Sequence, residues 1–418
     1  AAHTIADAVL AGAGYDTVKV AAGEYLESIA VNSPCVIAGG YDAGFTHHDP
    51  TVQVTRVRGV SSAVRFSAAA GAHCGVRHVT FHDCGAAVGS TPVPGSHGAA
   101  ILSLGASPTI EDCAFVDNRA PIGGGVGWGG AVLLHGGAPV VRRCEFTGNV
   151  ASHGGALALS QNAGALVEDC DFTGNGCTVV TGDYRGAAAF VSGGAATLRR
   201  CRFEDNGPTV AGGAVALVDG AQGVLEHCDL LANQASYGGG GAYLAGGSLV
   251  CLGGTWRGNL ATGGRGGGLL AEGGALEARH VVFAANQAAA LGGGVMASSV
   301  AGGAIEHCVF HGNAAAQFGG LLALPAGTFA ARHNVVVANG GGGSMVAGPS
   351  ATSDYNLAWQ NPAGDFLSAM GAHDRVADPC LVDPAGGDVA LGLHSAALDE
   401  GDPDPACQDP DGSRADLG

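Results

Sequence analysis

One asparagine position recurs nine times in this chain, at intervals of 26 to 31 residues, and each copy follows a bulky apolar residue by three positions. The nine asparagines are Asn118, Asn149, Asn175, Asn206, Asn233, Asn259, Asn286, Asn313 and Asn339. A Gly-Gly or Gly-Ala pair then opens the next apolar run, as at Gly130-Ala131. A repeat of this length cannot bury its own apolar face, whereas stacked copies can. The period therefore predicts a solenoid rather than two or three globular domains.

The segment 138–149, APVVRRCEFTGN, shows how one repeat is built. Val141 lies three residues before Cys144 and Phe146 lies two residues after it, so these apolar side chains cannot share one straight strand of period two. The polar pair between Val141 and Cys144 predicts a bend between two short strands that face one core.

The rest of the coil follows from its turn residues. Asn149 predicts a turn, because asparagine tolerates left-handed backbone geometry and forms local hydrogen bonds. The Gly pair starts a third strand at residues 131–134, and a second Gly pair at 136–137 turns the chain back. Three short strands and three turns in each repeat indicate a parallel β-helix, in which like residues stack about 4.8 Å apart.

The polar pairs alternate in charge from one repeat to the next. They are Glu111-Asp112, Arg142-Arg143, Glu168-Asp169, Arg199-Arg200 and Glu226-His227. Stacking in register would otherwise bring like charges into contact, which destabilises a sheet. The alternation favours salt-bridge ladders between coils, and the rival interpretation is a charged substrate cleft, which would need convergent charge of one sign.

Six of the thirteen cysteines share one position of the repeat, two residues before the bulky apolar residue. They are Cys113, Cys144, Cys170, Cys201, Cys228 and Cys308. Residues i and i+2 of a strand share a face, so this pattern predicts a buried, reduced column of thiols. Cys380 and Cys407 lie in an irregular segment, where a disulfide closes a loop that has little core of its own, and we expect them to pair.

Charge and hydropathy limit the partners of the chain. There are 18 basic and 36 acidic residues, for a formal charge of −18, so nucleic-acid binding is not expected. No window of eighteen apolar residues runs without interruption by glycine, so direct membrane insertion by a helix is not expected either.

The paired GGA and FxxN motifs, such as Phe146-Thr-Gly-Asn149, resemble the repeats of polymorphic outer-membrane proteins and the wider pectin-lyase-like group. The opening, Thr4-Ile5-Ala6-Asp7-Ala8-Val9, is similar to the N-terminal cap of that group, and Asp378-Pro-Cys380 is similar to the closing segment of many secreted members. The resemblance implies a right-handed parallel β-helix and an exported bacterial protein. It leaves function open, since such folds serve adhesins, surface-layer components and polysaccharide-cleaving enzymes alike.

We therefore predict an all-β chain, a single-stranded right-handed parallel β-helix with a short N-terminal helical cap at residues 3–12. The β-helix with its cap is expected to occupy residues 1–345, and an irregular C-terminal capping segment residues 346–418. Caps are needed because an open end would expose unpaired strand edges.

A catalytic set is not evident. The polygalacturonase-like branch of the group presents an Asp pair, a Gly-His-Gly and an Arg-x-Lys, all of which are missing from this sequence. No cofactor is expected. Calcium is a weak possibility at four acidic residues near the C-terminus, because acid-Gly loops can supply oxygen ligands, although such motifs more often form turns. These residues are Asp402, Asp404, Asp409 and Asp411.

Loops of extra length follow the asparagine turn in several repeats, at residues 89–98, 119–128, 176–185 and 235–239, so we expect them to lie along one edge. The rival interpretation is that these loops merely tolerate extra length. The residues expected to make this a binding edge are Trp128, His153, Tyr184 and Tyr237. The functional prediction is a non-catalytic cell-surface or extracellular scaffold or adhesin-like module that binds a protein or a surface glycan. The alternative is a polysaccharide lyase or glycoside hydrolase on the same fold.

Overall fold

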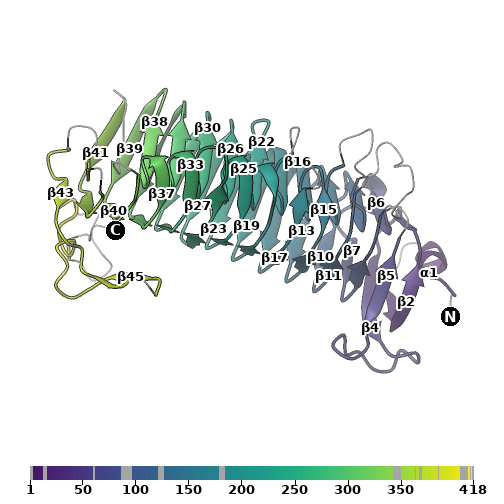
Figure 1. Ribbon diagram of the computed structural model, residues 1–418. Coiled ribbons are helices and arrows are strands. Elements are labelled where there is room, and N and C mark those ends of the chain that lie inside the picture. The colour runs from purple at the N-terminus through teal and green to yellow at the C-terminus, as the bar shows by residue number, and fades with distance from the viewer. Residues whose placement is uncertain are drawn as a thin grey trace. The chain divides into compact units, whose positions relative to one another are not determined.

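A computed structural model of the chain describes residues 3–12, 17–59, 62–85, 97–120, 127–177, 184–341, 350–362, 364–366, 370–384 and 386–404, together with 413, 414 and 416. It divides into two compact units, the first of residues 1–210 and 214–223 and the second of residues 211–213 and 224–418. Each unit is a stack of parallel β-coils (Figure 1). The predicted all-β fold class, the parallel β-helix, is confirmed.

In the first unit the strands form parallel sets that pair coil upon coil. One set is β1 (Thr17–Ala21), β4 (Val36–Tyr41), β7 (Gly75–Arg77), β10 (Thr109–Glu111) and β13 (Val140–Arg142). The next is β3 (Ile29–Val31), β6 (Val64–Ser67), followed by a 3-10 turn at Ala68–Ala70, β9 (Ile101–Leu104), β12 (Val132–His135) and β22 (Val215–Val218). The third is β2 (Gly23–Leu26), β5 (Thr55–Arg58), β8 (Thr80–His82), β11 (Ala114–Val116), β14 (Glu145–Thr147), β17 (Asp171–Thr173) and β20 (Arg202–Glu204). Two long strands, β16 (Leu157–Glu168) and β19 (Ala189–Arg199), span the first two sets, and short strands β15 (Val150–Ala151), β18 (Gly176–Cys177) and β21 (Thr209–Ala211) complete the coils.

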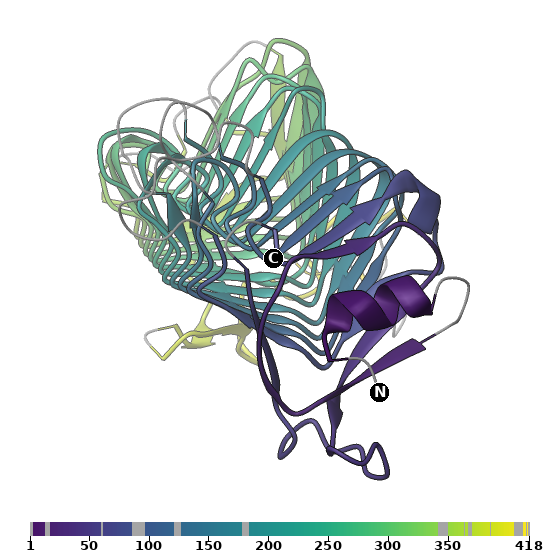
Figure 2. The ribbon, with the colours of Figure 1, turned by 90° about the vertical axis from the view of Figure 1, so that its right-hand side faces the viewer.

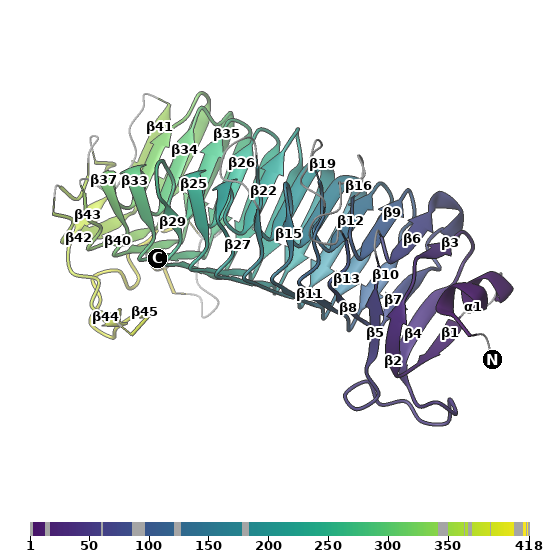
Figure 3. The same cartoon turned by 45° about the vertical axis from the view of Figure 1, so that its right-hand side comes forward.

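The second unit repeats the same sets. The first is β23 (Gln222–Glu226), β27 (Ser248–Leu252), β31 (Ala275–Arg279), β35 (Gly302–Glu306), β39 (Thr328–Arg332) and β41 (Ala351–Asp354). The second is β26 (Ala242–Ala245), β30 (Leu269–Glu272), β34 (Val295–Ser298) and β38 (Leu321–Leu324). The third is β24 (Asp229–Leu231), β28 (Thr255–Arg257), β32 (Val282–Ala284), β36 (Val309–His311), β40 (Val335–Val337), β42 (Leu357–Trp359) and β43 (Arg375–Val376). Short strands β25 (Gln234–Gly238), β29 (Leu260–Ala261), β33 (Gln287–Leu291) and β37 (Ala314–Gln317) pair in parallel (Figure 3), and an antiparallel hairpin, β44 (Leu381–Asp383) and β45 (Asp388–Leu391), follows.

Helix α1 (Ile5–Ala11) is the predicted N-terminal cap, and it lies against the first coil of its unit (Figure 2). The Thr4 hydroxyl accepts a hydrogen bond from the Asp7 N–H at 3.0 Å, which caps the helix N-terminus. The carboxylate of Glu27 accepts from the N–H groups of Ile5 at 3.0 Å and Ala6 at 2.9 Å. Ile5 and Val9 are buried beneath the helix, so its apolar face closes the end of the core.

The bend between the first and third sets is made by one residue in left-handed conformation, the second of each polar pair. Its φ is 52° at Asp112, 51° at Arg143 and 50° at Arg200. At the asparagine turn the prediction was wrong in detail: the left-handed residue precedes the asparagine, as at Asp117 (φ 51°) and Gly148 (φ 66°). The asparagine side chain points into the core, where its amide forms hydrogen bonds, as that of Asn149 does with the Phe115 carbonyl.

Several coils contain a fourth strand in addition to the three predicted. A short strand such as β15 follows the asparagine and forms a separate side of the coil. The Gly-Gly pair at 136–137 does not turn the chain to another face, since the equivalent residues of the next coil lie inside the single strand β16. Glycine is needed at both positions of the pair Gly129-Gly130 for different reasons. Gly129 adopts the left-handed conformation with φ 67°, and a Cβ on Gly130 would lie 2.0 Å from the carbonyl oxygen of Gly155.

The asparagines form a buried ladder in each unit. The Asn149 Nδ2 donates to the Phe115 carbonyl at 2.9 Å and to the Oδ1 of Asn175 at 2.9 Å. The Asn149 Oδ1 in turn accepts from the backbone N–H and the side-chain Nδ2 of Asn118, at 3.0 and 2.9 Å. All nine asparagines are at most 1% exposed. The ladder therefore satisfies backbone groups that the turn leaves unpaired inside the core.

The cysteine column occupies an equivalent place at the other bend. The Cys144 thiol lies 3.6 Å from the Ile110 carbonyl oxygen. This contact is equivalent to the hydrogen bond from the Asn149 amide to the Phe115 carbonyl. In the second unit the same position of the coil is occupied by Cys308, Asn334 and Asn356, and there the side chains form a true amide ladder, with Asn334 Nδ2 donating to Asn356 Oδ1 at 2.9 Å. Asp374 ends it by accepting from Asn356 Nδ2 at 2.9 Å. The prediction of a buried thiol column is confirmed, and the second asparagine ladder was missed.

The phenylalanines stack beside these ladders. In the first unit the rings of Phe115, Phe146 and Phe172 are nearly parallel, with centroid separations of 4.7 Å and 4.6 Å. Burial of each ring removes a large apolar surface from water, and the strand spacing holds the rings at stacking distance. The core of the coil is thus a set of continuous columns.

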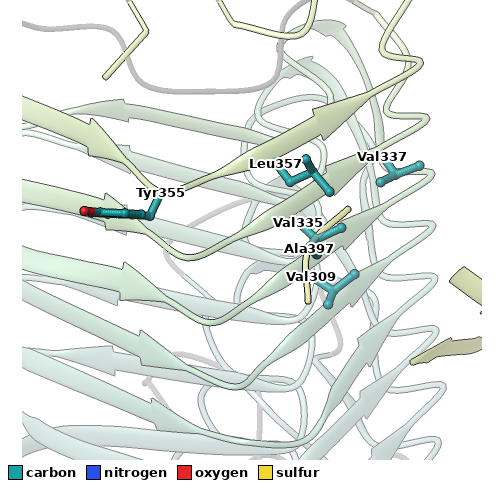
Figure 4. Close-up of a cluster of buried hydrophobic side chains, with 6 residues drawn as sticks. All are labelled: Val309, Val335, Val337, Tyr355, Leu357 and Ala397. Carbon is teal, nitrogen blue, oxygen red and sulfur yellow. The ribbon is translucent and has the colours of Figure 1, made fainter. Parts of the chain in front are cut away.

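The C-terminal segment departs from the predicted boundary and placement. Parallel pairing continues past residue 345 through β41, β42 and β43, so the β-helix ends later than predicted. The hairpin β44–β45 and Ala397 pack on the outside of the coils rather than forming only an irregular end. They cover a cluster of Val309, Val335, Val337, Tyr355 and Leu357 (Figure 4). The strand position of Val309, Val335 and Leu357 is charged in three successive coils of the first unit, at Glu145, Asp171 and Arg202, and is apolar where the hairpin covers it.

A column of aromatic side chains follows the left-handed bend in the second unit. His307 lies between His280 and His333, with ring centroids 5.2 and 4.6 Å away, and Tyr355 continues the stack 5.4 Å from His333. Burial, followed by the neighbouring imidazoles, lowers the pKa of His307 to about 4. Burial also lowers the pKa of His333, so His307 and His333 are neutral at pH 7 and can stack without charge repulsion.

We expect Asn149→Ala to lower the free energy of unfolding by roughly 3–5 kcal/mol, because it strands the Asn118 N–H and the Phe115 carbonyl in the core. Thr147→Ala, an exposed change at the end of β14 and two residues before Asn149, should cost less than about 0.5 kcal/mol. Denaturant unfolding of both variants measures the difference. Equal stability of the two variants would contradict a structural role for the ladder.

We expect the eleven buried cysteines to resist alkylation in the folded protein and to be free thiols once it is unfolded. Burial raises the pKa of Cys84 and Cys308 to about 12, which suppresses the reactive thiolate. Mass mapping without reductant tests this, and a Cys144–Cys170 bridge would contradict it. Cys380 is a free, exposed thiol in the structure and Cys407 lies outside the described residues, so their disulfide stays a prediction that the same mapping decides.

We expect the second unit to lose stability as pH falls from about 6.5 towards 4. The folded pKa of His307 lies below its unfolded value, so the stabilisation is complete above 6.5 and is lost on acidification. The loss from His307 amounts to roughly 2–3 kcal/mol. His307→Asn, which tolerates the left-handed backbone, should flatten the pH dependence of unfolding, whereas the exposed control His394→Asn should not. A parallel pH profile for His307→Asn and wild type would refute the assignment.

Candidate functional site

Three of the four residues predicted for the binding edge come together in the first unit. Trp128 pairs with His153 across successive coils, and His153 pairs with Arg185, the neighbour of Tyr184. The ring centroids of Trp128 and His153 are 6.0 Å apart, and those of His153 and Tyr184 are 6.2 Å apart. The expectation that these residues share one edge is met for this set.

Two further aromatic residues, missed in the sequence, join the cluster. Phe190 lies 5.4 Å from Trp128 and 4.7 Å from His153, edge-on to both rings, and the His97 ring lies 6.3 Å from Trp128. The Nδ1 of His97 accepts a hydrogen bond from the backbone N–H of Trp128 at 3.2 Å. We name the five residues His97, Trp128, His153, Tyr184 and Phe190 the aromatic corner.

The aromatic corner is less exposed than expected. Trp128 and Tyr184 are partly buried, and His153 is only 9% exposed, because the rings pack on one another at tilted or edge angles. Burial lowers the pKa of His97, which is therefore neutral at pH 7. The loop residues 89–96, 121–126 and 178–183 of the predicted edge lie outside the described residues. A half-covered group of aromatic rings with a neutral His97 imidazole can contact the apolar face of a sugar or an apolar side chain of a protein.

Tyr237, the fourth predicted residue, lies in strand β25 of the second unit. Its side chain is 44% exposed, and its hydroxyl donates to Glu272 Oε1 at 2.8 Å. Tyr243 donates to the other oxygen of the same carboxylate at 2.9 Å. Tyr237 is therefore an exposed tyrosine whose hydroxyl is held by a carboxylate that also binds Tyr243, and it is not part of the aromatic corner.

The alternating charges form the predicted ladders between coils. Arg142 Nη2 lies 2.6 Å from Glu111 Oε2, and Arg143 Nη2 lies 2.7 Å from Asp112 Oδ2. Arg200 Nε lies 2.7 Å from Asp169 Oδ1. The hydrogen bonds from Arg143 and Arg200 hold the pKa of Asp112 and of Asp169 below the ordinary value. These charges stabilise the register of the stack, each partly exposed pair by about 0.2–1 kcal/mol.

The weak calcium candidates do not form a ligand cluster among the residues with described positions. The Asp402 Oδ1 accepts from the Asp404 N–H at 3.0 Å, a local turn, and the Asp402 N–H donates to His333 Nε2 at 3.0 Å. Asp409 and Asp411 lie outside the described residues. In the described part of the chain no group of three or more His, Cys, Asp or Glu side chains is placed to hold a metal ion.

A polar pocket that the sequence analysis did not find lies elsewhere in the first unit. It measures about 260 Å³ and lies where the segment 42–54, between β4 and β5, meets the outer side of the coils. Pro50 lines it from the segment, and His78, Asp112, Arg143 and Glu145 line it from the coils. We name it the loop pocket. Its walls come from residues up to about 95 positions apart, so no local motif marks it.

Comparison with known proteins agrees with this architecture. No helix in the described part of the chain is long and apolar enough to span a membrane. No curated protein matches the sequence. Residues 62–288, more than half of the 418 residues, match the family model described as a right-handed β-helix region. Because this match covers more than half of the chain, the chain belongs to the right-handed β-helix family.

Proposed function

We propose that this protein is an exported, non-catalytic β-helix scaffold that binds a protein or a surface glycan at the aromatic corner. The observation that carries the proposal is the convergence of Trp128, His153 and Tyr184 from successive coils on one partly exposed cluster. Aromatic side chains offer large contact area at low entropic cost, and loops on a rigid scaffold often carry binding residues. The resemblance of the repeats to polymorphic outer-membrane proteins and the pectin-lyase-like group supports a place at the cell surface.

The rest of the coil supports a scaffold. Arg142, Arg143 and Arg200 form ion pairs that hold neighbouring coils together, and the buried amides are used by the ladder. A side chain committed to such a column has little freedom to rearrange around a reacting substrate.

The buried thiols are compatible with the proposed extracellular location. Burial raises the pKa of Cys144 and Cys170 well above the ordinary value. Disulfide exchange proceeds through the thiolate, so these residues resist oxidation even in an oxidising compartment. A reduced column is therefore compatible with export.

The alternative function is a polysaccharide lyase or glycoside hydrolase on this fold. The loop pocket favours it to the extent that an imidazole and carboxylates line one hollow. Glycosidic hydrolysis needs two carboxyl groups on opposite sides of the scissile bond, one of them with a raised pKa. Asp112 has the opposite shift, since its pKa is lowered by Arg143.

We expect the protein to bind one or more oligosaccharides on a glycan array without releasing products, and Trp128→Ala to weaken that binding at least about tenfold. Leu324→Ala, an exposed apolar change in the second unit, is the control and should bind as wild type. Circular dichroism confirms that both variants fold.

Release of unsaturated or reducing-end sugars would overturn the non-catalytic proposal and support the enzyme. Glycan binding that survives Trp128→Ala would reject the aromatic corner as the site. Absence of any bound glycan would eliminate sugars and leave a protein as the partner of the aromatic corner.

A further inference from the structure

The loop pocket has a wall that is rigidly built. The segment 42–54 is thirteen residues long, and connections of this length without secondary structure are uncommon in compact domains and are often functional. The Asp42 Oδ1 accepts from the N–H groups of Thr46 at 2.7 Å and His47 at 2.9 Å, and Oδ2 accepts from the Thr46 hydroxyl at 2.8 Å. These bonds, first that from the His47 N–H, lower the pKa of Asp42 to about 2. The segment is thus preorganised by local hydrogen bonds.

His48 fastens this segment to the coil. Its Nε2 donates to the Gly39 carbonyl at 3.1 Å. Its ring packs on Tyr41 with centroids 4.5 Å apart and meets His78 edge-on at 5.0 Å. Asp49 adds a second local turn by accepting from the Thr51 hydroxyl at 2.6 Å. These contacts hold the segment that forms the wall of the pocket in a fixed position against the coil.

The floor of the loop pocket consists of two columns from three successive coils. His78, Asp112 and Arg143 stand one above another at the left-handed bend, with φ of 55°, 52° and 51°. Thr80, Ala114 and Glu145 pair in register on the adjoining strands. Ala114 lies between two larger side chains, so its small size leaves a hollow of about one residue in the column.

Arg143 compensates the charge of one of the two carboxylates that line the pocket, Asp112 and Glu145. Arg143 donates from Nε and Nη2 to the Asp112 carboxylate at 2.8 and 2.7 Å, which fixes both groups. Burial lowers the pKa of His78, so its imidazole is neutral at pH 7 and offers one donor and one acceptor. Thr80 adds a hydroxyl, and Glu145 adds a carboxylate acceptor.

This lining selects for a neutral ligand rich in hydroxyl groups. An anion would meet the carboxylates of Asp112 and Glu145 on a chain of formal charge −18, and a cation would meet the Arg143 guanidinium. A hydroxyl group both donates and accepts, so it can satisfy the mixed set. The volume of about 260 Å³ lies just under the roughly 300 Å³ at which pockets for drug-sized ligands begin, which suits one sugar ring.

We propose that the loop pocket binds a single neutral sugar unit through Glu145, His78 and Thr80, as a site separate from the aromatic corner. Glu145 accepts from sugar hydroxyls, and Thr80 and His78 exchange hydrogen bonds with their neighbours on the ring. The site goes beyond the function proposed above, since it requires neither Trp128 nor a bound partner at that corner.

The test is saturation-transfer NMR of the full chain with methyl glycosides of glucose, galactose, mannose and N-acetylglucosamine, each at a concentration on the order of 10 mM. Glucuronate and glucosamine serve as the charged probes. We expect signals from at least one neutral glycoside and weaker signals from both charged sugars. Absence of signal from all four neutral glycosides, or stronger signals from a charged sugar, overturns the proposal.

Variants assign the signal to the loop pocket. Ala114→Leu fills the hollow from an outward-facing position and should reduce binding at least tenfold. Thr255→Leu is the matched control, because it makes the same kind of change at the equivalent strand position of the second unit and should bind as wild type. Glu145→Gln keeps the shape and removes the charge, and a threefold or greater loss is expected even if Ala114→Leu fails to fold.

Binding unchanged in both Ala114→Leu and Glu145→Gln rejects the site. Trp128→Ala should leave binding of the monosaccharide unchanged, so failure of the loop pocket and failure of the aromatic corner give different results. Loss of the monosaccharide signal in a folded Trp128→Ala would place that sugar at the aromatic corner and overturn the proposal.

Discussion

The buried amide of the repeating asparagine is the interaction on which the rest of the structure depends. One side chain binds the carbonyl of the preceding coil and the backbone N–H of its neighbour in the ladder, as Asn149 does with Phe115 and Asn118. A core turn without such a group would bury unpaired peptide groups, at a cost of about 1–3 kcal/mol for each. Because the amide reaches only from one coil to the next, it also fixes the distance and register at which the other columns form.

The columns that follow have different chemistry for one geometric reason. Stacking in register places each side chain above its equivalent, so a position works only if its residue is compatible with copies of itself or with an alternating partner. Phenylalanine rings stack, thiols pack as small hydrophobic groups, and glutamate alternates with arginine, as at Glu111 and Arg142. Histidines stack at the same bend in the second unit because burial keeps His307 neutral.

The repeat made much of this fold predictable from sequence. The period, the inward columns and the N-terminal helix follow from residues that recur or cap locally, and they are confirmed. The left-handed residue was misplaced by one position. The aspartate or glycine before the asparagine adopts the left-handed conformation, and the asparagine contributes its side-chain amide to the hydrogen bonds of the ladder. The covering of Val309 and Val335 by the C-terminal hairpin was missed, although their apolar character at a position that is charged in several earlier coils was a signal. The loop pocket was missed for a different reason: its wall, from Pro50, and its floor, from Arg143, meet only through the fold.

The two proposed binding sites share one logic, in which a rigid stack holds loop residues that no short motif connects. That logic requires the ladder to be intact and rigid in solution, and hydrogen exchange at single-residue resolution tests it most directly. The account predicts that the backbone amides of Asn118, Asn149 and Asn175 exchange at least about 10⁴-fold more slowly than an unprotected amide, and as slowly as the slowest residues of their strands. Exchange of these amides at the rate of an exposed turn would contradict it.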